Sequence, residues 1–482
     1  MYDTTLVAII TNRESIERRH REYNSLKYAL DALESAVMSV QPEILIRRAV
    51  KLRDSKLLIS DIMGNKAELN VDNFNSIFIV GAGKGTAKMA KALSNILKGK
   101  ITHGAINVPY GNKTHLDSIS ITEANHPIPD EAGVEGTNKI INILKKTHRS
   151  DLVFVLISGG GSALMPFPVS GLSLDDKKKI TSNMLASGAS IDEINIVRKH
   201  LSLIKGGRLV RFVKSGCTIF SLILSDVIGD DIATIASGPT VPDNSTFKDA
   251  AFILQKYHIF NNKNLEKSSL ITIIKKGLEG SIDDTPKPGN SIFNNVYNFL
   301  IGNNTLACNK AVESLRKNNI QVLHLGSSFN GQAIDFGKLL ARLTTDFAIS
   351  SLPIAFVLGG ETTVKLNKRR ENGKGGRNQE AILSAATMCR FEDGDDITII
   401  SMGTDGMDGN SMAAGGLLTP KTLYLIQKMS INLGKYLKNH DSYTALKKID
   451  SSLFSGRTGT NVNDIAIICI MKTLRSHSDD YS

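Results

Sequence analysis

Glycines, carboxylates and a lysine follow directly after short apolar runs at five places in the chain. The apolar runs cover residues 76–80, 152–157, 219–224, 353–358 and 396–400, and the segments after them read GAGKGT, SGGGSA, SDVIGDD, GGETT and SMGTDGMDG. Short β-rich runs bounded by glycine predict buried strands of a parallel sheet. Ligands of open α/β sheets bind beyond the carboxyl ends of the strands. The residue types at these ends could hold phosphate groups and a metal ion.

The first of these segments, GAGKGT at residues 81–86, differs from both common phosphate-binding loops. The dinucleotide pattern needs a third glycine where this chain has Thr86, and the nucleoside-triphosphate loop needs Ser or Thr directly after its lysine, where Gly85 stands. Lys84 nevertheless lies at an expected helix N-terminus, where an ammonium group and backbone N–H groups can bind a phosphate together. The alternative is an exposed lysine in a tight turn, and the spacing does not decide between the two.

The segment SGGGSA contains Ser158, Gly159, Gly160, Gly161 and Ser162. Consecutive glycines cost conformational entropy on folding, and they are useful where the backbone must approach an anion closely and donate N–H groups to it. Ser162 could bond to a phosphate oxygen or cap a helix. We therefore predict a phosphate-binding loop here in preference to a flexible turn.

Three aspartates near expected strand ends are candidates for metal binding or proton transfer. Asp226 follows the third apolar run, where a carboxylate can take a proton from a hydroxyl group or bind magnesium. Asp405 and Asp408 lie in TDGMDG, which lacks the spacing and the final Glu of a calcium-binding loop. We expect one of these two to bind a metal ion or the substrate and the other to form a turn, because Asp-Gly is common turn chemistry.

Residues 368–380, which read KRRENGKGGRNQE, are basic, glycine-rich and free of apolar side chains. Most of this segment has the composition of a solvated loop, and the functional alternative is a mobile lid that brings Arg377 over a phosphate. His126, in HPIPD, is expected to be structural rather than catalytic. The chain contains no GxSxG elbow, HExxH motif or HRD and DFG pair, which excludes the commonest hydrolases, zinc proteases and protein kinases.

The composition favours a cytoplasmic protein that acts on small anions. The 482 residues carry 58 Lys and Arg against 47 Asp and Glu, a net charge of +11, and a basic chain suits anionic partners. No motif for contacting nucleic-acid bases accompanies the scattered basic residues, and no apolar run is long enough for a membrane span.

The four cysteines form no CxxC pair, which favours reduced thiols over disulfides or zinc. The N-terminus lacks a signal-peptide pattern.

The length of the chain predicts two or three domains. We expect a variable extension at residues 1–24, helical structure at 25–55 from its one-sided apolar pattern, and alternating strands and helices from residue 77 onward. The stretch 261–290 has little apolar periodicity and contains TPKPG, so the domain boundary is predicted there. The expected domains are therefore residues 25–285 and 286–482, both of the α/β class.

Taken together, the motifs resemble those of the class II glycerate kinase family, the glycerate 2-kinases with a C-terminal MOFRL domain. The resemblance runs from about residue 28 to residue 470. The motifs that carry it are VGAGKGTAKMAKAL, NHPIPDEAG, SGGGSALMPFP, MLASGASIDEINIVRKHLSLIKGGRL, LSDVIGDDIATIASGPTVPD, GGETTV, GGRNQE, GTDGMDG and TGTNVNDI. The resemblance implies two α/β domains, the first Rossmann-like with a mostly parallel sheet and the second of MOFRL type, with the active site in the cleft between them.

The implied activity is the ATP-dependent and Mg2+-dependent phosphorylation of D-glycerate to 2-phosphoglycerate. The active-site lysine and arginine proposed for the family correspond to Lys84 and Arg377. The resemblance further implies that ATP binds to the SGGGSA loop and to Gly359, Gly360 and Glu361. It also implies that Asp226 or Asp405 holds Mg2+ and that one aspartate orients the substrate hydroxyl group.

Four positions depart from the family pattern: Gln332, Met407, Met412 and Arg457. They bear on acceptor specificity more than on the kinase chemistry, because the glycine loops and Asp405 are retained. Two other functions are considered. A nicotinamide-dependent hydroxypyruvate reductase is disfavoured by Thr86 and by the lack of an acid for the ribose, and a non-catalytic metabolite-binding protein is disfavoured by the retained charged residues. The sequence is compatible with a monomer or a homodimer.

Overall fold

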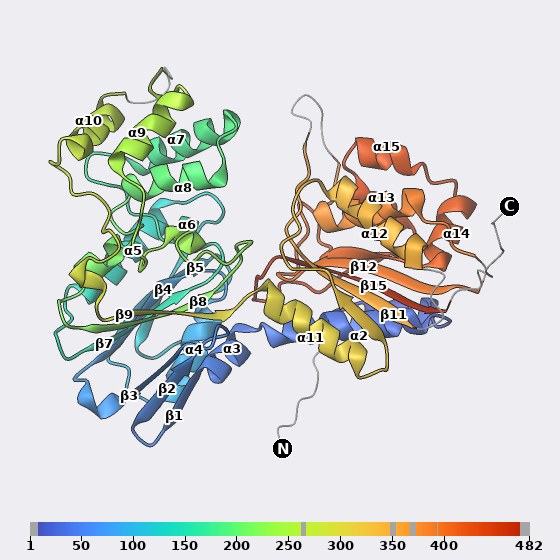
Figure 1. Ribbon diagram of the computed structural model, residues 1–482, viewed down its shortest axis with the longest axis horizontal. Helices are drawn as coiled ribbons and strands as arrows, with labels where there is room; N and C mark the ends of the chain where they lie inside the picture. The colour runs from blue at the N-terminus through green and yellow to red at the C-terminus, as the bar shows by residue number, and fades with distance from the viewer. Residues whose placement is uncertain (1–7, 262–266, 348–352, 367–372, 393, 473–482) are drawn as a thin grey trace. The chain divides into compact units, whose positions relative to one another are not determined.

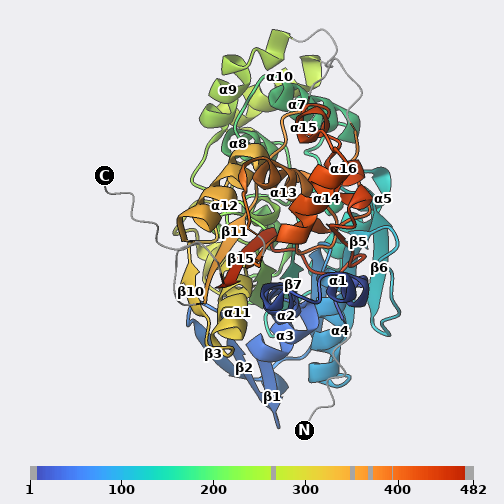
Figure 2. The same cartoon turned by 90° about the vertical axis from the view of Figure 1, so that its right-hand side faces the viewer.

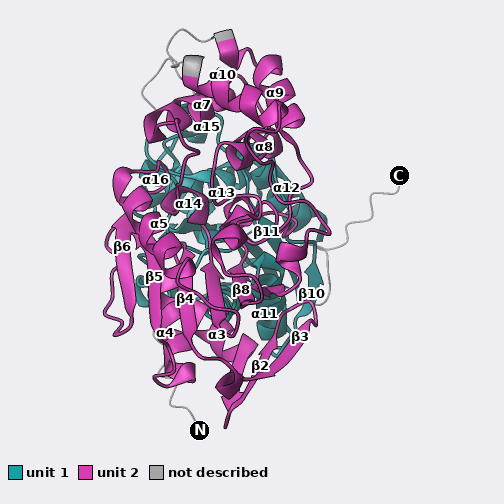
Figure 3. Cartoon of the chain, turned by 90° about the vertical axis from the view of Figure 1, so that its left-hand side faces the viewer, with its two compact units in different colours: residues 1–41, 303–482 teal, residues 42–302 magenta. Residues whose placement is uncertain are grey.

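The computed structural model describes residues 8–261, 267–347, 353–366, 373–392 and 394–472. The chain divides into two compact units, which Figure 3 shows in different colours. Unit 1 contains residues 1–41 and 303–482, and unit 2 contains residues 42–302. This division differs from the predicted boundary after residue 285, since strand β9 (Val296–Gly302) still pairs with the sheet of unit 2. No helix in the described ranges is long and apolar enough to cross a membrane.

Unit 2 is built on a six-stranded parallel sheet in the order β6-β5-β4-β7-β8-β9. Its central strands are β4 (Ile77–Ala82), β7 (Leu152–Ile157) and β8 (Thr218–Leu224), and they are buried along nearly their whole length. The outer strands are β5 (His103–Pro109) and β6 (Ile119–Ala124) on one side and β9 on the other. Continuous apolar runs are typical of strands covered on both faces, so the parallel sheet predicted from these runs is confirmed.

Three helices follow strand ends in this sheet: α4 (Thr86–Leu97), α5 (Glu131–Leu144) and α6 (Gly161–Leu164). Helix α5 is capped by Asp130, whose carboxylate accepts the N–H of Gly133 at 3.0 Å. Before the sheet, helix α3 (Pro42–Ala49) leads into an antiparallel sheet of β1 (Val50–Arg53), β2 (Lys56–Ser60) and β3 (Lys66–Asn70). The helix predicted over 25–55 is therefore wrong beyond residue 49.

A group of four helices in unit 2 has a hydrophobic core of its own (Figure 1). The helices are α7 (Leu174–Ala186), α8 (Ile191–His200), α9 (Phe247–Lys256) and α10 (Lys267–Leu278). Helix α10 buries Leu270, Ile273 and Ile274 in this core. The stretch 261–290 is therefore not a domain boundary, because these three apolar side chains pack into a core within unit 2.

Unit 1 is built on a mixed six-stranded sheet in the order β10-β11-β15-β12-β13-β14. Strands β11 (Ile354–Gly360) and β12 (Asp396–Gly403) are the predicted apolar runs, but they do not pair with each other. Strand β15 (Asp464–Lys472) lies between them and is antiparallel to both. The expectation of a parallel sheet is wrong here, because the final strand of the chain inserts in the opposite direction. Strand β10 (Gln321–His324) is parallel to β11, whereas β13 (Gly415–Leu418) and β14 (Ser452–Leu453) complete the antiparallel side.

The N-terminal residues are part of unit 1. Helix α2 (Asn24–Ser39) and helix α11 (Asn304–Arg316) are far apart in sequence and lie side by side (Figure 1 and Figure 2). Helix α1 (Arg13–Arg19) precedes α2, and Arg13 forms ion pairs of 2.5 Å with Asp31 and Glu34. The segment predicted as a variable extension is thus packed from Ile10 onward, where the side chain is buried.

The remaining helices of unit 1 are α12 (Ala333–Phe347), α13 (Arg377–Met388), α14 (Pro420–Lys428), α15 (Leu433–Lys438) and α16 (Ser442–Lys448). Helices α12 and α13 pack against each other, and their apolar residues share a core with β11, β12 and β15. The architecture of both units confirms the predicted α/β class.

Candidate active site

Three of the predicted site segments in unit 2 lie at one edge of the sheet. Strands β4, β7 and β8 are neighbours and run in the same direction, so their carboxyl ends meet at that edge. Lys84 follows β4, the loop 158–162 follows β7, and Asp226 follows β8. The topology therefore brings these predicted residues to the same side of the sheet.

The loop that carries Lys84 is fixed by the loop after β7. The N–H of Lys84 donates to the carbonyl oxygen of Gly159 at 2.9 Å, and the N–H of Gly85 donates to the hydroxyl oxygen of Ser158 at 3.0 Å. Ser158 is buried, and its hydroxyl also lies 3.2 Å from that of Thr86. Ser158 is therefore a positioning residue rather than an open phosphate ligand, and these two N–H groups are already used inside the protein.

The glycines of SGGGSA are explained in part by close packing. Gly160 adopts a φ of +82°, and a Cβ atom there would lie 2.8 Å from the ring of His126. A Cβ atom on Gly161 would lie 2.9 Å from the carbonyl oxygen of Ala82. Both positions therefore exclude larger residues. His126 packs against the loop, in agreement with its expected structural role.

Lys205 is a residue of this region that the sequence analysis missed. Its ammonium group donates to the Ser162 hydroxyl at 2.7 Å, to the Ser162 carbonyl at 2.9 Å and to the Ala236 carbonyl at 3.4 Å. Lys205 is 2% exposed, and burial lowers its pKa well below the ordinary value, with the charges of Lys177 and Arg198 contributing. The sequence signal for it is a lysine directly before two glycines, Gly206 and Gly207.

In unit 1, Arg377 is held by two carboxylates. Its guanidinium group donates to Asp464 through two bonds, Nε to Oδ2 at 2.5 Å and Nη2 to Oδ1 at 3.0 Å, and Nη1 lies 2.9 Å from Oε1 of Glu361. Burial lowers the pKa of Arg377, but the two carboxylates outweigh it, so the pKa rises above its ordinary value. Burial raises the pKa of Asp464 and Arg377 opposes that rise, so the ionised carboxylate depends on the arginine.

Asp464 was not among the predicted site residues, although it lies in the motif TGTNVNDI. The residue begins β15 and faces Gly360 of β11 on one side and Gly403 of β12 on the other. Its importance depends on the insertion of β15 between the two strands, which is a long-range pairing that no local pattern indicates.

Asp408 and Asp405 have different roles in the loop after β12. Asp408 is buried and accepts the N–H groups of Asn378 at 3.1 Å and of Gln379 at 2.9 Å, so it caps helix α13 from another segment. Burial raises the pKa of Asp408 to about 6, against the opposing effect of the Gln379 donors. Asp405 is half-buried, and its carboxylate accepts the N–H of Met407 at 3.1 Å in a tight turn.

A pocket of about 500 Å³ lies beside Arg377 within unit 1. This volume is in the range of small-molecule sites. Polar lining residues include Glu361, Glu380, Asn410 and His440. His440 contacts the buried Glu380 through Nδ1 at 3.0 Å, and burial raises the pKa of Glu380 while His440 opposes that rise. The wall thus carries the carboxylates of Glu361 and Glu380 beside Arg377 and His440, and this mixture of charges suits a small polar ligand.

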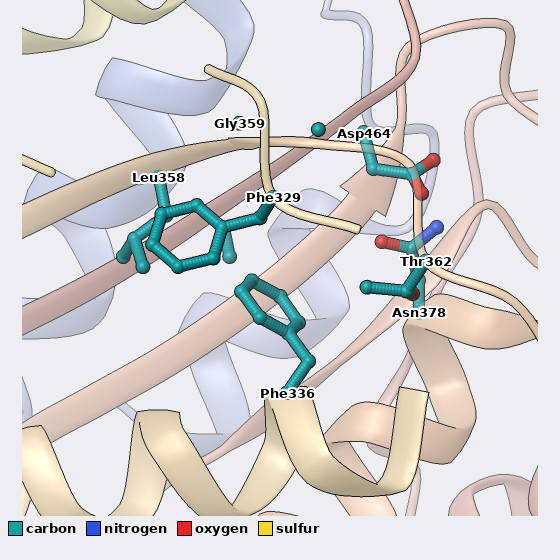
Figure 4. A pocket seen from close by; sticks show the side chains of 9 residues that line it. Phe329, Phe336, Leu358, Gly359, Thr362, Asn378 and Asp464 are labelled. Atoms are coloured by element: carbon teal, nitrogen blue, oxygen red, sulfur yellow. The ribbon is translucent and has the colours of Figure 1, made fainter. Parts of the chain in front are cut away.

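Gly359 and Gly360 are buried at the end of β11 rather than exposed to a ligand. A Cβ atom on Gly359 would collide with the side chain of Asn304, and one on Gly360 with the backbone of Phe329. Figure 4 shows the small cavity beside them, with Phe329 and Phe336 on one side and Asp464 on the other. Its volume of about 10 Å³ is close to that of one water molecule. Close packing therefore explains the two glycines. Of the three residues predicted to bind ATP here, Gly359, Gly360 and Glu361, Glu361 alone lines the larger pocket beside Arg377.

The described residues include no group of three or more His, Cys, Asp or Glu side chains arranged to hold a metal ion. Mg2+ in kinases is usually bound by one or two carboxylates together with phosphate oxygens and water. Asp226 and Asp405 are both half-buried at strand ends, which fits a metal ion that arrives with a nucleotide.

The expected lid is only partly described. Residues 368–372 lie outside the described residues, and 373–376 lead directly into α13. Arg377 is the first residue of this helix and is already held by Asp464. The expectation that Arg377 is carried by a mobile loop is therefore wrong, because the side chain belongs to a packed helix end.

Comparisons with known proteins agree with this architecture. The model of a domain of unknown function, DUF4147, matches residues 28–269, and the MOFRL family model matches residues 354–464. The chain is 38% identical to the glycerate 2-kinase of Pyrococcus horikoshii, over 90% of this chain and 95% of the relative. It is also 38% identical to a putative hydroxypyruvate reductase of Agrobacterium vitis, over 81% of this chain and 86% of the relative.

A solved structure has the same fold. The crystal structure of a glycerate kinase from Thermotoga maritima matches with a TM-score of 0.79 and 36% identity, over 92% of this chain and 99% of that chain. Identity at this level over nearly full length, together with the two matching family models, settles the relationship. The chain, whose residues 354–464 match the MOFRL family model, belongs to the glycerate 2-kinase family.

Proposed function

We propose that the protein transfers the γ-phosphoryl group of ATP to the 2-hydroxyl group of D-glycerate. The observation that carries this proposal is Arg377, which Asp464 and Glu361 hold in the wall of a pocket of about 500 Å³. A guanidinium group carries five N–H donors, so Arg377 can contact a carboxylate or phosphate in addition to Asp464 and Glu361. The relatives named glycerate 2-kinase support the same activity.

Phosphoryl transfer requires positioning and charge neutralisation more than covalent chemistry. In this proposal residues 159–162 and Lys84 bind the phosphates of ATP, with Ser158 positioning the loop of Lys84 and Ser162 held by Lys205. Arg377 binds the glycerate carboxylate or the transferred phosphoryl group. Asp226 or Asp405 accepts the proton of the substrate hydroxyl group, and the other holds Mg2+. The metal ion supplies neutralisation of the phosphate charge.

The experiment is to incubate the protein with ATP, Mg2+ and D-glycerate and to identify the product by 31P NMR. We expect 2-phosphoglycerate and ADP in equal amounts, and no product without D-glycerate. A product phosphorylated at the 3-hydroxyl group would contradict the proposed position, and the absence of any phosphoglycerate would contradict the kinase proposal.

The name of the Agrobacterium vitis relative makes the reductase reaction worth testing in parallel, with NADH and hydroxypyruvate. The structure gives a reason to expect no activity. Thr86, at the position of the third glycine, is fully buried at the start of α4 against Ser158. A dinucleotide loop needs a glycine at that position for close packing of the helix on the strand.

A further inference from the structure

Lys177 lies on the buried face of helix α7. It is 7% exposed and shares this face with Ile180 and Met184, which belong to the core of the helical group. Of its two neighbours in the sequence, Lys178 is half-buried and Lys179 is exposed. Lysine is almost never fully buried unless it is paired, so the inward position of Lys177 requires an explanation.

The surroundings of Lys177 are positively charged. Among the described residues its ammonium group has no hydrogen-bond partner. Burial, with a smaller contribution from the charge of Arg198, lowers the pKa of Lys177 to about 7. The same two cations lower the pKa of Lys205, after the larger effect of burial. In contrast, Lys199 has its own carboxylate partner, Asp243, at 3.2 Å.

Lys205 and the helix face that carries Arg198 are connected to the loop after β7. Lys205 donates to the hydroxyl and the carbonyl oxygen of Ser162, and the Ser162 hydroxyl lies 3.2 Å from that of Ser237. The Ser237 hydroxyl donates in turn to the side-chain oxygen of Asn195 at 3.3 Å. Asn195 and Arg198 are three residues apart on α8, so they lie on the same face of that helix.

We propose that Lys177, Arg198 and Lys205 form an oxyanion site that binds the phosphate groups of the nucleoside triphosphate beside Ser162. Lys177 and Arg198 contact the anion, and Lys205 also positions the loop. The inference rests on the proposed kinase function and adds residues on α7 and α8 to its nucleotide site.

The reason is the balance of charge. Burial and the neighbouring positive charges disfavour the protonated forms of Lys177 and Lys205 in the free protein, and a bound anion would favour these protonated forms. A triphosphate carries at least three negative charges and can neutralise all three cations, whereas the single carboxylate of D-glycerate can neutralise only one. The triphosphate is therefore the better match of the two substrates.

The test compares Lys177→Met with Lys179→Met in the full-length protein. Lys179 belongs to the same lysine run but is exposed, so its variant controls for the loss of a positive charge. Inorganic tripolyphosphate and, separately, D-glycerate are titrated by calorimetry, and thermal unfolding of the free variants is recorded. We expect Lys177→Met to bind tripolyphosphate about ten-fold to a hundred-fold more weakly, as for loss of a charged hydrogen bond. Lys179→Met should bind like the wild type.

The free Lys177→Met protein should melt at or above the wild-type temperature, because it lacks a buried amine that has no hydrogen-bond partner. Lys177→Gln serves as a second variant if the methionine disturbs folding. Wild-type affinity for tripolyphosphate in the Lys177 variants, or weakening of D-glycerate binding alone, would overturn the proposal. Tripolyphosphate binding through Lys177 without any kinase activity would leave this site standing and reject the proposed function. Kinase activity with unchanged triphosphate affinity in the Lys177 variants would reject this site and leave the proposed function standing.

Discussion

Among single residues of the candidate site, Arg377 has well-defined side-chain contacts. Its two parallel bonds to Asp464 need a planar guanidinium group, which lysine cannot replace. We predict that Arg377→Lys lowers kcat/KM with ATP and D-glycerate by about ten-fold or more, since a charged hydrogen bond contributes about 1.5–3 kcal/mol. Steady-state kinetics measure this effect. The exposed Arg390, exchanged in the same way, is the control and should retain full activity.

The two half-buried aspartates at strand ends, Asp226 and Asp405, should show different kinetic effects when each is replaced. Asp226→Asn and Asp405→Asn both remove a carboxylate charge with little change of shape. The variant that loses a metal ligand should need a higher Mg2+ concentration for half-maximal rate. The variant that loses the proton acceptor should show a lower kcat at an unchanged Mg2+ requirement. A Mg2+ titration of the rate distinguishes them, and unchanged kinetics in both variants would remove both residues from the site.

At the scale of elements, helix α13 depends on a cap from a distant segment. Asp408 accepts the first free N–H groups of the helix whose first residue is Arg377. We predict that Asp408→Ala lowers the free energy of unfolding by about 1–2 kcal/mol and also lowers kcat/KM, because the helix end positions Arg377. Thr246→Ala removes the cap of α9. It should reduce stability by a similar amount while leaving kcat/KM unchanged, and equal activity losses in both variants would contradict this role of Asp408.

At the scale of the whole molecule, the N-terminal residues stabilise unit 1 in a manner that depends on pH. His20 is buried, and its Nδ1 lies 3.1 Å from the Thr419 hydroxyl. Burial lowers the pKa of His20 to about 4, with the charge of Lys421 contributing. The unfolded chain binds this proton near pH 6.5, so between pH 6.5 and pH 4 the unfolded state holds more protons. The contribution of His20 to stability is therefore complete above pH 6.5 and is lost as the pH falls toward 4.

The size of this loss should be at most about 3 kcal/mol, from 1.36 kcal/mol per pKa unit. Urea unfolding of the wild type and of His20→Asn at pH 7.5 and pH 4.5 measures it. The difference in stability between the two proteins should shrink at the lower pH. A difference that is constant with pH would show that His20 is protonated in the folded protein as readily as in the unfolded chain.

The sequence by itself determined the features that depend on neighbouring residues. The apolar runs 76–80, 152–157 and 219–224 each contain enough β-rich side chains to predict strands covered on both faces, and the structure has them as β4, β7 and β8. Strand ends follow from the same local signals, so Lys84, the loop 158–162 and Asp226 could be placed at one sheet edge.

Only the tertiary structure decided which distant groups meet. Asp464 became the partner of Arg377 because β15 inserts between β11 and β12, and strand order depends on pairing across the whole unit. Lys177 is one of three adjacent lysines, and only the packing of α7 distinguishes it from the exposed Lys179. The first residues of the chain joined unit 1 for the same reason, since α2 finds its apolar partners on α11 and β15. Burial and charge pairing are properties of three-dimensional neighbours, and a local pattern carries no information about them.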